Sequence, residues 1–328
     1  MNIIFSMGDC NGIGLECFAK AVEEFDRTIS NKGSFDFHIA GNLKTITEYY
    51  DFIDMPIFVD DDSLVINNRK CKIIPCNKYA SVRFGKETKE AGALAAQAIE
   101  IALEKTINKE YDALVTLPVS KAALYLSGWE FPGHTEMLAN KCRIDDPLMI
   151  LCTEEIRVTL ATVHEALEKV PKQLTIESLK NRLLSFNLSL KNDFGVSDPN
   201  IAVMALNPHA GEGGSMGKEE IEIISPAINQ AINSDIMADG PFPADGFFAH
   251  GTYKNYDGIL AMYHDQGLIP LKIFASGAGV NFTGNLPIVR TSPDHGTAFQ
   301  IAGKNQADFR STYEAIQMAI KIYENRGI

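Results

Sequence analysis

The chain has 328 residues, of which 22% are charged, and its formal net charge is −12. Because single hydrophobic cores stop growing at about 250–300 residues, a chain of this length is expected to fold as two domains. The acidic balance argues against nucleic acid or an anionic membrane surface as a partner. An anionic substrate would therefore need a local group of cationic side chains.

The six cysteines form no CxxC pair, which indicates reduced, packed thiols rather than a disulfide framework. The first residues, MNIIFSMGD, lack the basic segment and the long apolar run of a secretion signal. No stretch approaches the ~20 apolar residues that a membrane span needs. We therefore expect a cytoplasmic protein that does not use a membrane as a partner.

Strand and helix patterns alternate along the first part of the chain. Strands are expected at residues 2–7, 35–40, 57–59, 71–75 and 112–117, and helices at 15–25, 43–51 and 86–105. The last of these strands is a continuous apolar run of the kind found in parallel sheets. The alternation predicts an α/β fold.

Three glycines, Gly8, Gly12 and Gly14, follow the first expected strand. Their GxxxGxG spacing differs from the GxGxxG of a Rossmann nucleotide-binding loop, and no strand ending in Asp or Glu follows at the expected distance. A tight turn between strand and helix is the better interpretation. The acidic run at 60–62 is interpreted as a solvated turn, since its neighbours supply no further metal ligands.

The same alternation continues through the second half. Strands are expected at 147–152, 156–163, 201–206 and 257–263, helices at 174–190, 218–233 and 308–325, and a rigid bend at 240–245. In the segment 261–304, glycines and prolines recur so often that no long regular element is expected to cross it. We interpret that segment as part of an active-site wall.

Two segments before residue 140 carry polar groups that a ligand could use. Lys121 directly follows an expected strand, where ligands usually bind, although an ordinary place at a helix start is equally compatible. Pro132 and Gly133 predict a turn before a helix that Thr135 would cap. Exposed N–H groups together with His134 could seat a phosphate or carboxylate. From this segment alone, a capped helix with a surface histidine is the simpler interpretation.

Three histidines, His164, His209 and His264, each follow a strand of similar character (VTLATVH, AVMALNPH and ILAMYH). Because strand carboxyl ends converge on one edge of an α/β sheet, these side chains could meet there. Three imidazoles are a complete protein ligand set for a catalytic divalent metal with an open position. One such histidine would more often be structural, but three in the same topological position favour a metal site.

Charged side chains near this site could complete it. Asp265 or Asp245 could orient an imidazole. Lys272 and Arg290 could hold a phosphate group, and Arg290 could do so through two parallel hydrogen bonds. A metal held by neutral ligands keeps its full positive charge, which acidifies a bound alcohol or stabilises an enolate.

Three long strings, NPHAGEGGSMG at 207–217, MYHDQGLIPLK at 262–272 and RTSPDHGTAFQIAGK at 290–304, resemble the 4-hydroxythreonine-4-phosphate dehydrogenase family of pyridoxal phosphate biosynthesis. The likeness runs nearly from end to end. It implies an isopropylmalate-dehydrogenase-like fold of two α/β domains with a cleft between them. We expect residues 1–125 and 268–328 to form the cofactor side, and 126–267 to form the side for metal, substrate and dimerisation.

The resemblance also implies a set of functional residues. One divalent ion (Zn, Mg, Co or Mn) would be bound by His164, His209 and His264. The substrate would be contacted by His134, Thr135, Lys272, Asn281 and Arg290. The adenosine part of NAD, or of NADP, would lie against His295, Gly296, Thr297 and Ala298, in a segment similar to the nucleotide loop of isopropylmalate dehydrogenases. That placement accounts for the missing GxGxxG.

The implied reaction is an oxidation followed by loss of CO₂. 4-Phosphooxy-L-threonine would transfer a hydride to NAD⁺ and become a β-keto acid, which decarboxylates to 3-amino-2-oxopropyl phosphate. The metal would lower the pKa of the alcohol and stabilise the enolate. The proton acceptor stays open between Lys121, Asp245 and a metal-bound water. A homodimer with active sites at the subunit interface is implied as well.

The sequence departs from the family pattern at a few positions. Cys10 and Asn11 replace the usual Pro-Ala, Leu15 stands where Pro is common, and Gln300 stands where Asp is usual. The segment that follows His164, EALEKV, also differs. None of these changes removes a proposed metal ligand or phosphate contact, but Gln300 bears on the details of cofactor binding.

The sequence is less compatible with two other functions. A related β-decarboxylating dehydrogenase of another phosphorylated or carboxylated hydroxy acid is disfavoured, because such enzymes normally hold their metal with aspartates. A non-catalytic metal- or phosphate-binding protein on the same fold is also disfavoured. Such a protein would not need metal, phosphate and adenosine features together.

Overall fold

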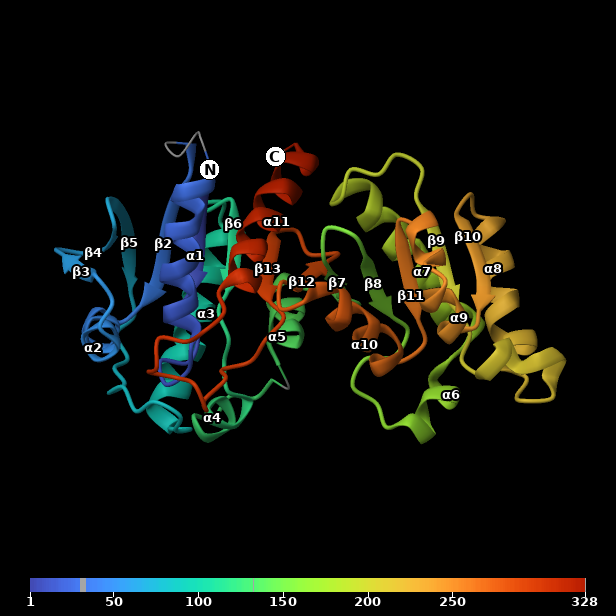
Figure 1. Cartoon of the computed structure of the whole chain (residues 1–328), viewed down its shortest axis with the longest axis horizontal. Coiled ribbons are helices and arrows are strands. Elements are labelled where there is room, and N and C mark those ends of the chain that lie inside the picture. The colour runs from blue at the N-terminus through green and yellow to red at the C-terminus, as the bar shows by residue number, and fades with distance from the viewer. Residues whose placement is uncertain (30–33, 132, 328) are drawn as a thin grey trace. The chain divides into compact units, whose positions relative to one another are not determined.

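The computed structural model describes residues 1–29, 34–131 and 133–327 (Figure 1). The chain divides into two compact units, the first made of 1–145 and 286–323 and the second of 146–285 and 324–328. Both boundaries lie later in the chain than the expected ones. The reason is that helix α5 (His134–Cys142) belongs to the first unit, and strand β12 (Val280–Gly284) to the second.

The first unit contains a mostly parallel sheet. Its strands are β1 (Asn2–Ser6), β2 (Asp36–Gly41), β3 (Ile57–Asp60), β4 (Ser63–Ile66), β5 (Arg69–Pro75), β6 (Ala113–Thr116) and β13 (Val289–Pro293). They lie in the order β13-β6-β1-β2-β5-β4-β3. All pairs are parallel except those of β4 with its two neighbours, β3 and β5. The strands expected in the first part of the chain are therefore present, and the sequence pattern missed two strands of this sheet, β4 and β13.

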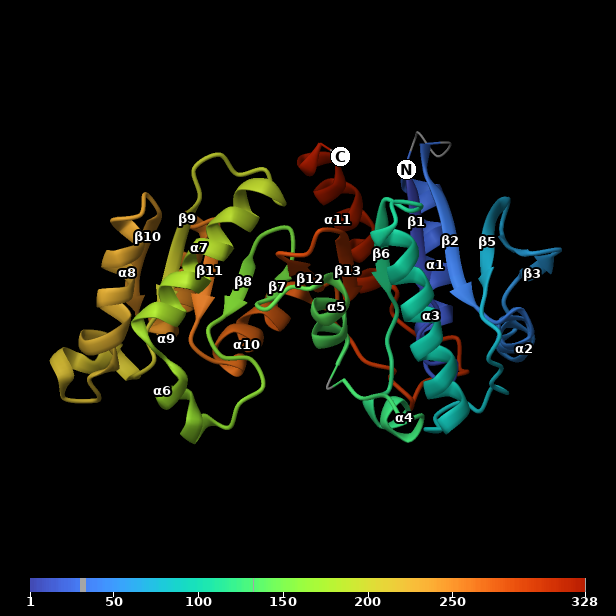
Figure 2. The same ribbon diagram turned by 180° about the vertical axis from the view of Figure 1, so that it is seen from behind.

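Helices cover both faces of this sheet. They are α1 (Gly14–Thr28), α2 (Leu43–Ile53), α3 (Lys89–Ile107), α4 (Lys121–Leu126), α5 and α11 (Arg310–Arg326). Helices α1 and α11 lie on the face seen in Figure 1, and α3 lies on the opposite face seen in Figure 2. The rings of Phe5, Phe18, Phe25 and Phe37 are buried and meet edge to face between β1, β2 and α1. This apolar packing holds α1 against the sheet.

The second unit contains a mixed sheet. Its strands are β7 (Leu148–Cys152), β8 (Arg157–Leu160), β9 (Asn200–Met204), β10 (Met237–Phe242), β11 (Gly258–Ala261) and β12. They lie in the order β10-β9-β11-β8-β7-β12. Strands β8 to β11 are parallel, whereas β7 runs antiparallel to both of its neighbours. The α/β class expected from the sequence is confirmed in both units.

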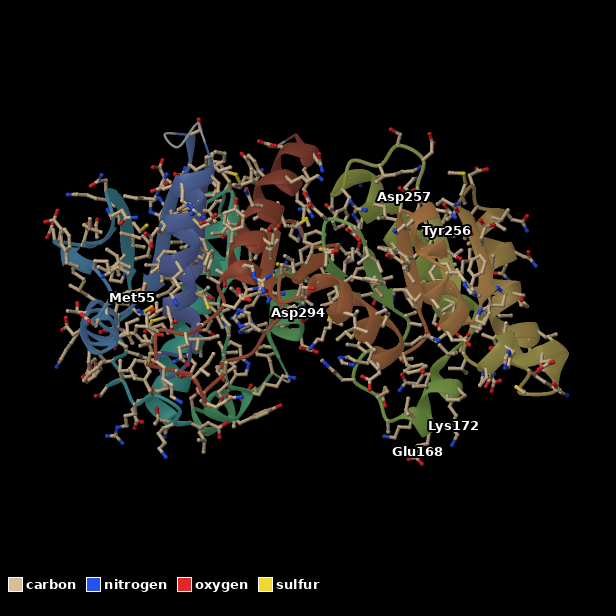
Figure 3. The ribbon with its side chains drawn as sticks, viewed as in Figure 1. Met55, Glu168, Lys172, Tyr256, Asp257 and Asp294 are labelled. Atoms are coloured by element: carbon tan, nitrogen blue, oxygen red, sulfur yellow. The ribbon has the colours of Figure 1, made fainter. Side chains whose placement is uncertain are left out.

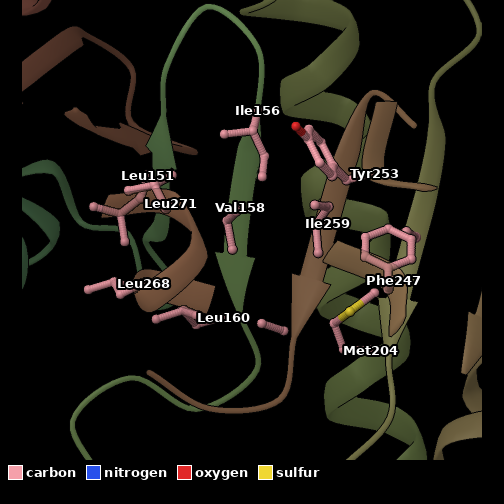
Figure 4. Close-up of a cluster of buried hydrophobic side chains, with 12 residues drawn as sticks. Leu151, Ile156, Val158, Leu160, Met204, Phe247, Tyr253, Ile259, Leu268 and Leu271 are labelled. Carbon is pink, nitrogen blue, oxygen red and sulfur yellow. The ribbon is translucent and has the colours of Figure 1, made fainter. Parts of the chain in front are cut away.

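The helices of the second unit are α6 (Val170–Gln173), α7 (Ile176–Asn192), α8 (Ser225–Ile232), α9 (Ala244–Ala249) and α10 (His264–Ala275). Helix α10 packs through Leu268 and Leu271 on the face that carries Val158 and Ile259 (Figure 4). Helix α7 covers the other face, where a Cβ on Gly258 would lie 2.5 Å from the ring of Phe186. The missing side chain at this position lets the helix approach the strand closely.

The expectation that no long element crosses 261–304 is wrong, because α10 spans twelve residues of it and includes Pro270. Tertiary packing explains the helix. Gly267 lies against Val158 and Leu160, where a Cβ would come within 2.8 Å of both side chains. Burial of this face stabilises the helix although Pro270 lacks a backbone donor.

Two other expected elements differ in detail. The helix expected at 218–233 is a π-helix over Glu220–Ile224 followed by α8. The bend expected at 240–245 is an irregular end of β10 with a cis Gly240–Pro241 bond, followed by α9. The acidic run at 60–62 is the turn between β3 and β4, as expected. The turn assigned to Pro132 lies outside the described residues.

In the ranges that are described, no helix is long and apolar enough to cross a membrane.

Candidate active site

Three histidines follow the carboxyl ends of three adjacent parallel strands in the second unit. His164 follows β8, His209 follows β9, and His264 begins α10 after β11. Because β11 lies between β8 and β9, the topology alone brings the three segments to one edge of this sheet. The rings of His164 and His264 have centroids 6.0 Å apart. His209 is exposed.

This donor set fits a divalent transition metal in kind, since imidazole suits such ions and three protein ligands leave a position for substrate. Two rings that share one tetrahedral ion would have centroids about 5 Å apart. The spacing of His164 and His264 is close to that. Within the described parts of the chain, no three His, Cys, Asp or Glu side chains are grouped closely enough to hold a metal ion. The fold therefore brings the three candidate ligands to one edge of the sheet, but their side chains are not grouped around one point in the described structure.

A carboxyl group orients one of the three rings. Asp265 Oδ1 lies 2.7 Å from Nδ1 of His264. A neutral ring that donates through Nδ1 carries its lone pair on Nε2, which is the arrangement that metal-binding histidines use. The other candidate for this role, the carboxyl group of Asp245, is exposed in the first turn of α9.

Hydrogen bonds join the three strand ends beyond the sheet itself. The hydroxyl of Thr162 donates to the carbonyl of Met262 at 2.8 Å. Gln266 accepts from the N–H of Met262 at 2.7 Å and donates to the carbonyl of Ala205 at 2.6 Å. The side chain of Gln266 thus links the end of β11 to the end of β9. Sequence reasoning missed this residue, although its place two positions after His264 could have indicated it.

The first unit contains a cavity of about 170 Å³ at the carboxyl ends of β6 and β13 and the starts of α4 and α5. Lys121, His134 and His295 are its chemically active lining residues. His134 is partly buried, and its Nε2 has no access to solvent and no hydrogen-bond partner among the described residues. An unpartnered polar atom beside a cavity is a natural contact for a ligand.

Burial and two neighbouring cations keep His134 neutral. Desolvation, followed by the positive charges of Arg290 and Lys121, lowers the pKa of His134 to about 3. A neutral imidazole can offer one N–H to an anion while the two cations supply the charge. The expectation of an ordinary surface histidine at this position is wrong, because Nε2 is buried.

Helix α5 begins two residues earlier than expected. Its N-cap is Gly133, in extended backbone with φ −171° and ψ −175°, and no side chain caps the helix. Thr135 is the second helical residue, so its assignment as the cap is wrong. Among the described residues, no side chain accepts from the N–H groups of the first turn, of which His134 is the first residue. Such a helix start suits an anion.

Arg290 lies almost fully buried in β13, with 2% of its surface exposed. Its Nε and Nη2 donate to Thr116 Oγ1 at 3.2 and 2.6 Å, and Thr116 lines the cavity. Burial lowers the pKa of Arg290 to about 10, so the guanidinium stays charged at neutral pH. Lys121 is exposed at the start of α4, which Ser120 caps. Two cations therefore lie close to one neutral imidazole.

The five expected substrate residues divide between the two units. His134, Thr135 and Arg290 belong to the first unit, and Lys272 and Asn281 to the second. Lys272 is exposed in the last turn of α10. Asn281 lies in β12, and its Oδ1 is buried without a hydrogen-bond partner in the described structure.

The segment expected to hold the nucleotide, His295 to Ala298, packs on the glycine loop after β1. The N–H of Ile13 donates to the carbonyl of Thr297 at 3.1 Å, and a Cβ on Gly12 would lie 2.8 Å from the same oxygen. The protein's own backbone therefore occupies the space beside Gly12 and Ile13, which agrees with the tight-turn interpretation of the loop. Asp294, labelled in Figure 3, donates its N–H to Ser311 Oγ at 2.9 Å and so fixes the segment to α11.

Comparison with known proteins identifies the family. The family described as pyridoxal phosphate biosynthetic protein PdxA matches residues 35–319. The chain is 39% identical over 333 aligned residues to 4-hydroxythreonine-4-phosphate dehydrogenase of Bacteroides thetaiotaomicron, covering 99% of this chain and 90% of that protein. It is 38% identical over 333 residues to the enzyme of the same name from Caulobacter vibrioides, covering 99% and 98%.

Solved structures of dehydrogenases also match this chain. The crystal structure of 4-hydroxythreonine-4-phosphate dehydrogenase from Klebsiella pneumoniae matches with a TM-score of 0.83 and 33% identity, covering 98% of this chain and 99% of that one. A terephthalate 1,2-cis-dihydrodiol dehydrogenase from Burkholderia xenovorans matches with a TM-score of 0.63 and 25% identity, covering 98% of each chain. On these matches, the chain belongs to the PdxA family of pyridoxal phosphate biosynthetic proteins.

Proposed function

We propose that this chain is a 4-hydroxythreonine-4-phosphate dehydrogenase that depends on NAD and a divalent metal ion. Relatives of that name match nearly its whole length. The observation that carries the proposal is the placement of His164, His209 and His264 at the ends of three adjacent parallel strands. In the proposed reaction the substrate alcohol gives a hydride to NAD⁺ and a proton to a base. The β-keto acid then loses CO₂ to give 3-amino-2-oxopropyl phosphate.

The three histidines would hold the ion (zinc, magnesium, cobalt or manganese), which when bound supplies stabilisation of negative charge on a substrate oxygen. Asp265 orients His264 for this role. Lys121 and Asp245 are the two side chains proposed to accept the hydroxyl proton. Lys121 lines the cavity of the first unit, whereas Asp245 is exposed on α9.

The phosphate group is proposed to bind at the start of α5. Lys121 and Arg290 supply positive charge beside the neutral ring of His134, and the first-turn N–H groups of α5 lack a side-chain cap. Lys272, Asn281 and Thr135 are proposed as further substrate contacts. The adenosine of NAD, or of NADP, is proposed to lie against 295–298. We further propose a cytoplasmic homodimer with active sites at the subunit interface.

The decisive test is the appearance of NADH absorbance when purified protein is given NAD⁺, a divalent metal and 4-phosphooxy-L-threonine. Arg290→Gln removes the charge but keeps an amide that can donate to Thr116. We expect it to lower kcat/KM. The corresponding loss of transition-state stabilisation should be ~2–4 kcal/mol, the scale of charge-assisted hydrogen bonds in a partly desolvated site. The loss should be much smaller with unphosphorylated 4-hydroxythreonine.

Lys141→Gln, on an exposed cation in the last turn of α5, is the matched control and should leave kcat/KM nearly unchanged. Equal losses on the phosphorylated and unphosphorylated substrates would show that Arg290 does not recognise phosphate. Absence of NADH with this substrate, in protein loaded with metal, would contradict the proposed function.

A second candidate is a dehydrogenase of another hydroxylated substrate. The observation in its favour is the likeness to the terephthalate 1,2-cis-dihydrodiol dehydrogenase, which spans 98% of both chains. The charges of Lys121 and Arg290 beside the cavity favour a phosphorylated substrate over an aromatic diol. NADH formation with a cis-dihydrodiol, and none with 4-phosphooxy-L-threonine, would select the alternative.

A further inference from the structure

The loop that carries His209 has an unusual backbone. Five consecutive residues, His209 to Gly213, have φ between 42° and 76°, in the left-handed region. Three of them, His209, Ala210 and Glu212, are not glycine, so each has an unfavourable contact between its Cβ and the backbone. Such a run persists only where surrounding contacts fix it, and strained backbone of this kind concentrates at functional sites.

One buried carboxyl group provides such contacts. Glu220 has 3% of its surface exposed. Its Oε1 accepts from the N–H of Leu206 at 2.9 Å and from the N–H of Asn207 at 2.7 Å. Its Oε2 accepts from Nδ2 of Asn207 at 3.0 Å. Both oxygens therefore accept hydrogen bonds from the segment two and three residues before His209.

The left-handed run also closes over this carboxyl group. A Cβ on Gly211 would lie 2.6 Å from Glu220 Oε2, so only glycine allows the approach seen here. The loop then turns back, with the N–H of Met216 donating to the carbonyl of Gly211 at 3.1 Å. Glu220 is the first residue of the π-helix, a rare element that occurs frequently at functional sites.

We propose that Glu220 is a positioning residue that holds His209 in the left-handed backbone conformation from which it binds the metal ion. The inference rests on the proposed function, because it takes His209 as a ligand. Glu220 makes no contact with an imidazole in the described structure and acts through residues 206 and 207. In Glu220→Gln one oxygen can still accept from the two backbone N–H groups, but Nε2 of the glutamine would face Nδ2 of Asn207, donor against donor. This unfavourable contact would release the loop that presents His209.

Cobalt(II) binding tests the positioning role of Glu220 without an assay of catalytic activity, because the visible spectrum of Co²⁺ reports the number and kind of its ligands. Glu220→Gln keeps the size of the side chain but replaces one of two acceptor oxygens with a donor. We expect it to weaken Co²⁺ binding ~10–100-fold, the scale for residues that orient metal ligands. Its spectrum should shift toward that of His209→Ala. Glu222→Gln, on the exposed side of the same π-helix, is the matched control and should bind like wild type.

A rescue experiment separates positioning from general support of the fold. If Glu220 offsets the cost of left-handed backbone, then Ala210→Gly with Glu212→Gly should restore several-fold of the lost Co²⁺ affinity in the Glu220→Gln chain. A chain destabilised for another reason would not recover. Circular dichroism and thermal melting establish that each variant is folded. If Glu220→Gln does not fold, Gly211→Ala, which forces the loop off the carboxyl group, must weaken Co²⁺ binding to a similar extent.

Unchanged Co²⁺ affinity and spectrum in Glu220→Gln, or in Gly211→Ala should that be the variant measured, would overturn the role of Glu220 while leaving the metal site intact. A wild-type chain that binds no Co²⁺ would overturn both this role and the metal part of the proposed function. The two failures are therefore distinguishable in one set of titrations.

Discussion

Asp9 carries a buried carboxyl group just after β1, with 1% of its surface exposed. Its Oδ1 accepts from the N–H of Asn11 at 2.9 Å, whereas Oδ2 is buried without a hydrogen-bond partner among the described residues. Burial raises the pKa of Asp9 to about 6, with a smaller contribution from the charge of Glu87, while the backbone N–H groups of Asn11 and Ser120 act to lower it. The group is thus ionised at neutral pH at a cost to stability.

The pH dependence follows from the sign of this shift. Between the unfolded value of 3.8 and the folded value of about 6, the folded chain holds a proton that the unfolded chain has lost, so Asp9 makes stability fall as pH rises. Asp9→Asn should therefore raise the free energy of unfolding above pH 6, by at most ~3 kcal/mol, and have little effect below pH 4. Urea unfolding at pH 4, 5.5 and 7.5 measures this.

The control for that series is Asp51→Asn, whose carboxyl group is exposed on α2. It should leave the free energy of unfolding near the wild-type value at each pH. A stabilisation of Asp9→Asn that is equally large at pH 4 and pH 7.5 would show that packing, and not the buried charge, is responsible.

At the scale of elements, the contact between α3 and α4 depends on one glycine. Gly92 lies inside α3, where glycine costs about 1 kcal/mol relative to alanine. A Cβ at this position would overlap the carbonyl oxygen of Ala123, on α4. The two helices approach each other through the missing side chain, and this contact places Lys121 at the cavity.

Gly92→Ala should therefore be destabilising, although alanine is the better helix former. We expect a net loss of ~1–3 kcal/mol, the usual cost of overpacking, and a lower kcat/KM because α4 carries Lys121. Thermal melting and NADH kinetics measure the two effects. Gly246→Ala in α9, where the nearest atom would be 3.8 Å away, is the matched control and should be neutral or slightly stabilising. An equal response of the two variants would mean that the α3–α4 contact relaxes freely.

Sequence patterns predicted most of the strands but missed some of the helices. Apolar runs such as 112–117 predicted most strands, because continuous burial requires continuous apolar sequence. The helix α10 was missed because Gly267 and Pro270 are locally unfavourable in helices, and only the contact of Gly267 with Val158 and Leu160 reveals their use. The π-helix at Glu220 was missed because it depends on bonds to residues thirteen and fourteen positions away.

The residues of the candidate site could also be predicted only in part from the sequence. His164, His209 and His264 could be associated from topology, since each follows a parallel strand. The burial of Nε2 of His134 reverses its interpretation as a surface residue, and four residues within 292–296, distant in sequence, line the same cavity. The roles of Gln266 and Glu220 are hydrogen bonds between elements, and no local pattern encodes them.

At the scale of the whole molecule, an acidic chain must attract an acidic substrate. The net charge of −12 repels anions at long range, and salt screens that repulsion within about 10 Å. Lys121 and Arg290 provide positive charge beside a cavity of about 170 Å³, where screening is weaker. Substrate affinity should accordingly depend on these two cations, and on the subunit that supplies them if the protein is a dimer.

The proposed dimer can be tested by mixing two inactive variants. His209→Ala removes a proposed metal ligand of the second unit, and Arg290→Gln removes a proposed phosphate contact of the first unit. If metal ligands and phosphate contacts of one active site come from different subunits, a hybrid dimer contains one site without either change. Activity should then return on mixing, to at most about one quarter of wild type, because half of the dimers are hybrids and each has one working site of two. The NADH assay after verified subunit exchange measures this recovery.

If no activity returns on mixing, His209 and Arg290 of one active site belong to the same chain. Full activity of a monomer would exclude shared sites.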